Sequence, residues 1–178
     1  QGGQPQRVQF DVPSNTREVM LDLWYPQANR IGVRVTPPGA TATPTATIAP
    51  PSSSTIPLSN GNSAFVDSDL TVPGNNDNRI FIILRPGSGV TVQPGTWTLE
   101  LSGTGPWQAW IQRHSSSEFR PPFRSPASTI SVPGTSRSVI TAGAYVSNGA
   151  NTGARASRSP SASTSTGAAS MTSTASSA

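Results

Sequence analysis

A cluster of hard oxygen ligands between Asp67 and Asn78 is the one group of side chains in this 178-residue sequence that suits metal chemistry. Asp67 and Asp69 lie two residues apart at the end of an alternating segment, and Asp77 follows in an Asn/Asp-rich stretch. Two carboxylates with this spacing can share a Ca²⁺ with loop carbonyls, although the regular spacing of an EF-hand loop is absent. Asn and Asp are also ordinary turn residues, and we favour a turn over a calcium site.

Residues for catalysis are few. His114 is the only histidine, so a pair of histidine metal ligands is excluded, and no nucleophile is marked beside it. The sequence contains no Cys, which excludes disulfides, thiolate nucleophiles and thiolate metal sites. We therefore expect His114 to be a surface loop residue without a role, and we expect this chain alone not to be an enzyme and to need no cofactor other than the calcium considered above.

The four Trp residues divide into two groups by their position in alternating segments. Trp97 and Trp107 are in phase with the apolar positions of their segments, which predicts that they belong to the core. Trp24 and Trp110 fall on the opposite faces and are predicted to be exposed. They could stack on sugar rings, but we favour packing against another protein surface or against the rest of a protease.

The segments that carry these residues alternate as half-buried β-strands do. Val8, Phe10 and Val12 share one face, and alternation recurs over 18–25, 31–35, 56–58, 64–69, 97–101 and 107–112. A last apolar segment spans 138–145. Residues 79–85 form the most apolar run and are predicted to be a central strand buried on both faces. The Asn60-Gly61 pair predicts a hairpin, and the Thr/Pro/Ala/Ser stretch up to Ser54 is expected to be an extended edge or a loop with Ile48 as its anchor.

The spacing of strands and turns predicts an all-β, two-sheet antiparallel β-sandwich of jelly-roll type with about eight or nine strands. Eighteen Pro and sixteen Gly leave little room for helices. We expect one sandwich domain over 1–146 and a low-complexity Ser/Thr/Ala-rich tail over 147–178. The tail is too poor in apolar residues to order by itself, so we expect an edge strand or a neighbouring subunit to hold it by β-augmentation. Residues 41–55 and the tail also have the composition of O-glycosylated stalks.

The charge distribution argues against nucleic acid. The net charge is +4 and the pI is about 11.0, but the twelve basic residues are all Arg and are spread singly. A phosphate-binding surface clusters its cations. We expect solvated strand faces and no nucleic-acid partner. No apolar run has the length of a membrane span. Because the sequence starts at Gln1 without Met or a signal peptide, we expect a processed or excised piece, and its composition suggests a GC-rich genome.

Five runs of residues resemble a known domain: L-D-L-W-Y-P (21–26), N-G-N-S-A-F-V-D-S-D-L (60–70), N-R-I-F-I-I-L (78–84), P-G-T-W-T-L-E-L-S-G-T (94–104) and P-G-T-S-R-S-V-I-T-A-G-A-Y (133–145). Over residues 7–147 the chain resembles the β-sandwich inserted in the catalytic domain of bacterial subtilisin-like serine proteases. The last run is similar to the strand by which such an insert returns into the protease sheet. The resemblance implies a secreted, extracellular, bacterial protein.

The catalytic parts of that family are not matched. Its Asp and His would precede Gln1, and its nucleophile stands in a Gly-Thr-Ser-Met-Ala context at a helix start. Gly134-Thr135-Ser136 is followed by Arg137 and a predicted strand, and Ser170-Met171 lacks the preceding Gly-Thr. We interpret both as coincidences.

Three functions remain open. The first is a non-catalytic structural or interaction module, which could assemble through its tail and whose partner is a protein, either copies of itself or the remainder of a protease. The second is a fragment of an active secreted subtilisin-like serine endopeptidase. The third is a carbohydrate-binding sandwich.

Overall fold

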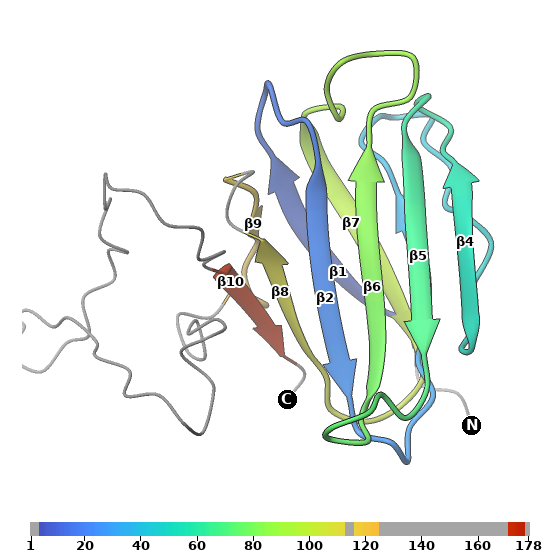
Figure 1. Cartoon of the computed structure of the whole chain (residues 1–178). Coiled ribbons are helices and arrows are strands. Elements are labelled where there is room, and N and C mark those ends of the chain that lie inside the picture. The colour runs from blue at the N-terminus through green and yellow to red at the C-terminus, as the bar shows by residue number, and fades with distance from the viewer. Residues whose placement is uncertain (1–3, 113–115, 125–170, 177–178) are drawn as a thin grey trace, which may run out of the picture.

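The computed structural model describes residues 4–112, 116–124 and 171–176, and these residues form a sandwich of two antiparallel sheets (Figure 1). The predicted all-β sandwich is confirmed. Sheet A has the strand order β3-β7-β1-β9, and sheet B has the order β10-β8-β2-β6-β5-β4. Sheet A consists of β1 (Gln6–Val12), β3 (Gly32–Thr36), β7 (Gly95–Ser102) and β9 (Glu118–Phe119). Sheet B consists of β2 (Val19–Tyr25), β4 (Ser52–Pro57), β5 (Ser63–Asp69), β6 (Asn78–Arg85), β8 (Gln108–Gln112) and β10 (Met171–Ser176).

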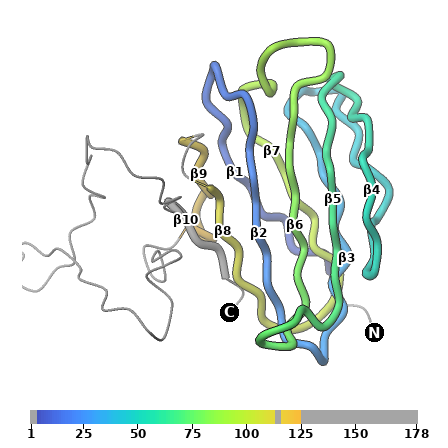
Figure 2. Tube along the Cα trace, in the orientation of Figure 1, coloured from blue at the N-terminus to red at the C-terminus, as the bar shows by residue number. Residues whose placement is uncertain are grey.

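The chain crosses between the sheets at most of its turns, as the Cα trace in Figure 2 shows. Only the connections β4–β5 and β5–β6 join neighbouring strands of one sheet within residues 4–112. The Asn60-Gly61 hairpin is confirmed, because β4 pairs with β5 around it and Gly61 has a φ of +81°. A side chain at this φ would be strained, which explains glycine at the turn.

The core between the sheets follows the predicted alternation. Val8, Phe10 and Val12 are buried from sheet A, and alternate residues of β2 are buried from sheet B. Trp97 and Trp107 are both buried, as predicted. The Phe10 ring lies 6.4 Å from the Trp97 ring and 6.3 Å from the Phe119 ring between centroids, so β9 belongs to the same core.

The predicted edge or loop before Ser54 divides into two parts. Ile48 is buried and makes an isolated bridge to Val33, and residues 52–54 begin the edge strand β4. The strand predicted over 138–145 and the domain boundary at 146/147 lie outside the described residues. Within the tail, β10 pairs with β8, which is the pairing that the edge-strand alternative predicts.

The described residues include no helix with the length and apolar character to cross a membrane.

Candidate interaction surface

The outer surface of sheet B carries the two Trp residues that were predicted to be exposed. Trp24 on β2 and Trp110 on β8 alternate with core residues, so both point away from the core and both are partly buried. The register places Trp110 opposite Asp22, and Trp24 opposite Arg79 of β6. Two residues far apart in the sequence therefore belong to one surface.

Further apolar side chains of neighbouring strands complete this surface. Met20 lies opposite Ile83, and Ile83 lies opposite Phe65 on β5. Phe81 lies opposite Asp22. None of these side chains is more than partly exposed, and Ile83 is only 9% exposed. We refer to the outward apolar residues of β8, β2, β6 and β5 as the aromatic face: Met20, Trp24, Phe65, Phe81, Ile83 and Trp110.

Arg79 lies level with Trp24 at one end of the aromatic face and contacts three side chains of its surroundings. Its Nε donates to Asp22 Oδ1 at 2.7 Å, and its Nη2 donates to Asp22 Oδ2 at 3.2 Å. Its Cζ lies 4.7 Å from the centroid of the Phe81 ring and 5.5 Å from that of Trp24. Sequence reasoning placed Arg79 on a solvated strand face, whereas its side chain is only 30% exposed. A guanidinium held between two rings and a carboxylate is a pre-organised group of the kind found at interaction hot spots.

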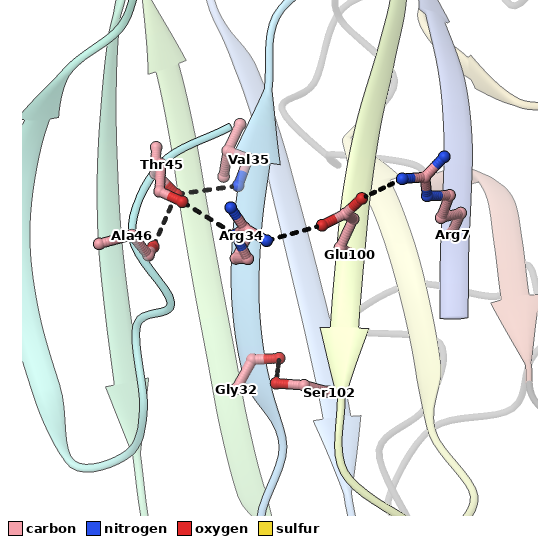
Figure 3. Close-up of polar contacts among 8 residues, drawn as sticks. All are labelled: Arg7, Gly32, Arg34, Val35, Thr45, Ala46, Glu100 and Ser102. Atoms are coloured by element: carbon pink, nitrogen blue, oxygen red, sulfur yellow. Dashed lines mark hydrogen bonds and ion pairs between the residues drawn. The ribbon is translucent and has the colours of Figure 1, made fainter. Parts of the chain in front are cut away.

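The outer surface of sheet A is polar by contrast. Glu100 on β7 accepts ion pairs from Arg7 at 2.9 Å and from Arg34 at 3.3 Å, and Arg34 Nε donates to the Thr45 carbonyl (Figure 3). The outward positions of β1, β3 and β7 carry no apolar side chain: Arg7, Gln9, Asp11, Arg34, Thr36, Thr96, Thr98, Glu100 and Ser102. Sheet A therefore has the ordinary character of a strand surface in water, and sheet B does not.

The residues of the calcium prediction are placed as turn and strand residues. Asp67 and Asp69 are outward residues of β5, and Asp69 lies opposite Arg79. The Asp77 amide donates to Asn75 Oδ1 at 3.1 Å, and the Asp77 carbonyl accepts from the Val72 amide, as in a turn. In the part of the chain that the structure describes, no three Asp, Glu or His side chains gather around a common point that could hold a metal. Calcium binding stays a prediction that rests on the sequence.

A shallow hollow of about 320 Å³ lies beside β9 and contains charged groups of both signs. Asp11 pairs with Arg120 at 2.8 Å, and Glu118 pairs with Arg124 at 3.0 Å. Burial opposes ionisation of Asp11, but hydrogen bonds from Thr96 and Arg120 outweigh it and lower the pKa of this carboxyl group. The Asp11 carboxylate is thus stabilised in its ionised form, as is typical of a structural ion pair.

The remaining sequence candidates, which are His114, the 134–136 motif and Ser170, lie outside the described residues.

The described residues define an all-β, two-sheet sandwich with one polar and one aromatic outer surface. No protein-family model matches the sequence, and no curated protein matches it. Among solved structures, the fold is similar to that of the CspB protease of Clostridium perfringens, with a TM-score of 0.68 and 21% sequence identity. The similarity covers 82% of this chain and 31% of the protease chain, so this chain spans less than a third of the length of that protein. At 21% identity the comparison establishes the fold alone. The same fold therefore occurs within a protease chain, which agrees with the fold that the resemblance implies.

Proposed function

We propose that this chain is a non-catalytic, extracellular structural and interaction module, related to the accessory sandwich of subtilisin-like proteases, that packs against protein through its aromatic face. The observation that carries the proposal is the contrast between the two outer surfaces. Sheet A presents ion pairs and hydroxyls to water, whereas sheet B presents partly buried Trp, Phe, Met and Ile side chains around a fixed Arg. Aromatic residues, Met and Arg are the types enriched in protein interfaces.

The occupant of the aromatic face is a protein rather than a polysaccharide. A sugar would stack on an open ring face, but the Arg79 guanidinium already covers one face of Phe81 and one of Trp24. Asp22, which is 18% exposed, pairs with Arg79, and the outward Asp67 and Asp69 of β5 lie opposite Phe81 and Arg79. A partner whose surface is apolar and carries few acidic groups fits this arrangement, and the partners that we propose are a second copy or the remainder of a protease. The tail adds a second means of self-assembly.

The proposal is tested by measuring whether this chain binds two protein probes. We expect Trp24→Ser and Phe81→Ser to weaken binding at least about tenfold, because central aromatic anchors contribute more than about 1.4 kcal/mol. The probes are a second copy, followed by sedimentation velocity, and an isolated subtilisin-like catalytic domain. The control is Thr98→Ser on the polar surface of sheet A, which should leave binding unchanged. Absence of binding to both probes, or equal weakening by the control, would contradict the proposal.

The alternative function is a fragment of an active secreted subtilisin-like endopeptidase. The coverage of 31% of the CspB chain supports it, because a working protease would need a much longer chain. The intact mass of the protein from its native source separates the two functions. A mass near 18.4 kDa and no hydrolysis of a chromogenic peptide agree with the non-catalytic module, and a larger mass with hydrolysis agrees with the endopeptidase.

A further inference from the structure

The edges of the two sheets differ in how they are closed. An edge strand presents unpaired backbone N–H and C=O groups to any other strand, and proteins normally protect such edges. If β10 is left aside, the described sheets end at four edges, which are β3 and β9 in sheet A and β4 and β8 in sheet B.

Three of these edges have a protection of their own. The β3 edge is covered by residues 45–48, since Val33 and Ile48 exchange two backbone hydrogen bonds of 2.9 Å and the Thr45 amide donates to the Val35 carbonyl. The β4 edge is flanked by Pro50, Pro51 and Pro57, which cannot donate to another strand. The β9 edge is only two residues long. These three edges therefore offer a strand of another molecule few opportunities for backbone pairing.

The β8 edge lacks these protections and is covered by a strand from the tail. Residues 108–112 contain neither a proline nor a charged residue. The strand β10 pairs with them in antiparallel register, with Ser176 opposite Gln108 and Thr174 opposite Trp110. Because the pairing is formed by backbone groups, the β8 edge is an acceptor for an extended segment.

The strand β10, which pairs with the β8 edge, lies far along the sequence from the rest of the described residues. The 46 residues 125–170 separate Arg124 from Met171, and a chain of 46 residues can span up to roughly 150 Å. The backbone contacts between β10 and β8 are the same whether the two strands belong to one chain or to two. Only the cost of closing the loop differs, and this cost grows with the number of residues between the two strands. Strands of neighbouring copies can therefore compete with the strand in cis.

We propose that the β8 edge accepts residues Met171–Ser176 of a second copy, so that copies of this chain assemble by exchanging the tail strand. This proposal rests on the self-assembly included in the proposed function and assigns the acceptor, the donor and their register. Exchange is favoured where copies are concentrated or are already held together by the aromatic face, to which Trp110 of β8 belongs.

Cross-linking in trans tests the proposal, because the sequence has no Cys of its own. Gln108 is exposed and lies opposite Ser176, and opposed Cα atoms in antiparallel strands are about 4.5–5.5 Å apart, within reach of a disulfide. Full-length Gln108→Cys and Ser176→Cys proteins are mixed near millimolar concentration and oxidised, and heterodimers are counted by intact mass. The control mixture pairs Ser176→Cys with Thr55→Cys, which lies exposed on the opposite edge strand β4.

We expect at least about tenfold more heterodimer than in the control mixture, and we expect Thr174→Pro in the donor chain to remove this excess, because proline has no backbone N–H to give. The double variant Gln108→Cys/Ser176→Cys reports pairing within one chain. An internal disulfide in the double variant with no excess heterodimer in the mixture would show that the strand stays in cis and would overturn the exchange. No cross-link in either experiment would overturn the acceptor itself. Near millimolar concentration the exchange does not require docking through the aromatic face, and the binding assay with Trp24→Ser and Phe81→Ser tests that face separately.

Discussion

The ion pair between Arg79 and Asp22 allows a quantitative test of whether the aromatic face is pre-organised. The perturbations are Asp22→Asn, Arg79→Met and the double variant. The two side chains are 30% and 18% exposed and are joined by two hydrogen bonds. At an effective dielectric constant of about 20, two charges about 4 Å apart attract by about 4 kcal/mol, and desolvation and side-chain ordering reduce the net coupling of such a partly exposed pair to about 1 kcal/mol.

The single and double variants should then lower the free energy of unfolding by different amounts. Asp22→Asn should lower the free energy of unfolding by about 1 kcal/mol. Arg79→Met should lower it by about 2 kcal/mol, because it also removes two contacts with Trp24 and Phe81 worth about 0.5 kcal/mol each. The double variant should lose about 2 kcal/mol instead of the sum of about 3 kcal/mol. Urea unfolding followed by Trp fluorescence measures this, since 1 kcal/mol shifts the midpoint by about 0.5 M.

A second pair, formed by Arg85 of β6 and Glu18 directly before β2, is the matched control. Arg85 Nε and Glu18 Oε2 are 2.8 Å apart, but the two side chains are 55% and 25% exposed, and Arg85 has no aromatic contact among the described residues. The coupling free energy between Arg85 and Glu18 should be about 0.3 kcal/mol and should decrease as the salt concentration rises. If the Arg79 and Asp22 variants are additive within about 0.3 kcal/mol, the guanidinium is solvated and the pre-organised surface does not exist.

Two further predictions concern the residues that hold the sandwich together. Asn78 is fully buried and its Nδ2 donates to three carbonyls in the turn 26–29, so Asn78→Ala should lower the free energy of unfolding by about 2–4 kcal/mol in urea. Burial opposes the ionisation of Asp11, but hydrogen bonds from Thr96 and Arg120 outweigh it and lower the pKa of this carboxyl group. The contribution of Asp11 to the free energy of unfolding is therefore present above its unfolded pKa of about 3.9, and it is lost as the pH falls through the folded value. Asp11→Asn should flatten the loss of stability below about pH 4, by less than about 1 kcal/mol because the pair is half exposed, and an unchanged acid profile would contradict the ion pair.

Local alternation was sufficient to predict which face of each strand is buried. Trp97 lies in phase with Leu99 and Leu101, and Trp24 lies out of phase with Leu23, so a period of two placed one in the core and the other outside. A strand of five or more residues contains enough of this period to be recognised. The same argument found β1, β2, β3 and the β4–β5 hairpin.

The aromatic face could be predicted only in part, because it depends on strand pairing that is not local. The sequence marks Trp24 and Trp110 as outward, but the alignment of Met20 with Ile83, and of Ile83 with Phe65, needs the order β2-β6-β5 and its register. The apolar run 79–85 was predicted to be buried on both faces, which holds for Ile83, while Phe81 is partly exposed. Strand β9 has two residues and lies before a Pro-rich stretch, and β10 has no apolar alternation, so neither had a periodic signal.

The aromatic face and the β8 edge are two features of one strand, and this links the proposed function to the exchange of the tail. Trp110 lies on the outer surface of β8, and the backbone of the same strand pairs sideways with β10. A second copy that packs on the aromatic face is brought beside the β8 edge, which raises the local concentration of its tail strand above that of a free chain. Docking through the face and pairing at the edge should therefore be positively coupled, and loss of the face by Phe81→Ser should reduce trans cross-linking of Gln108 and Ser176 without abolishing it at high concentration.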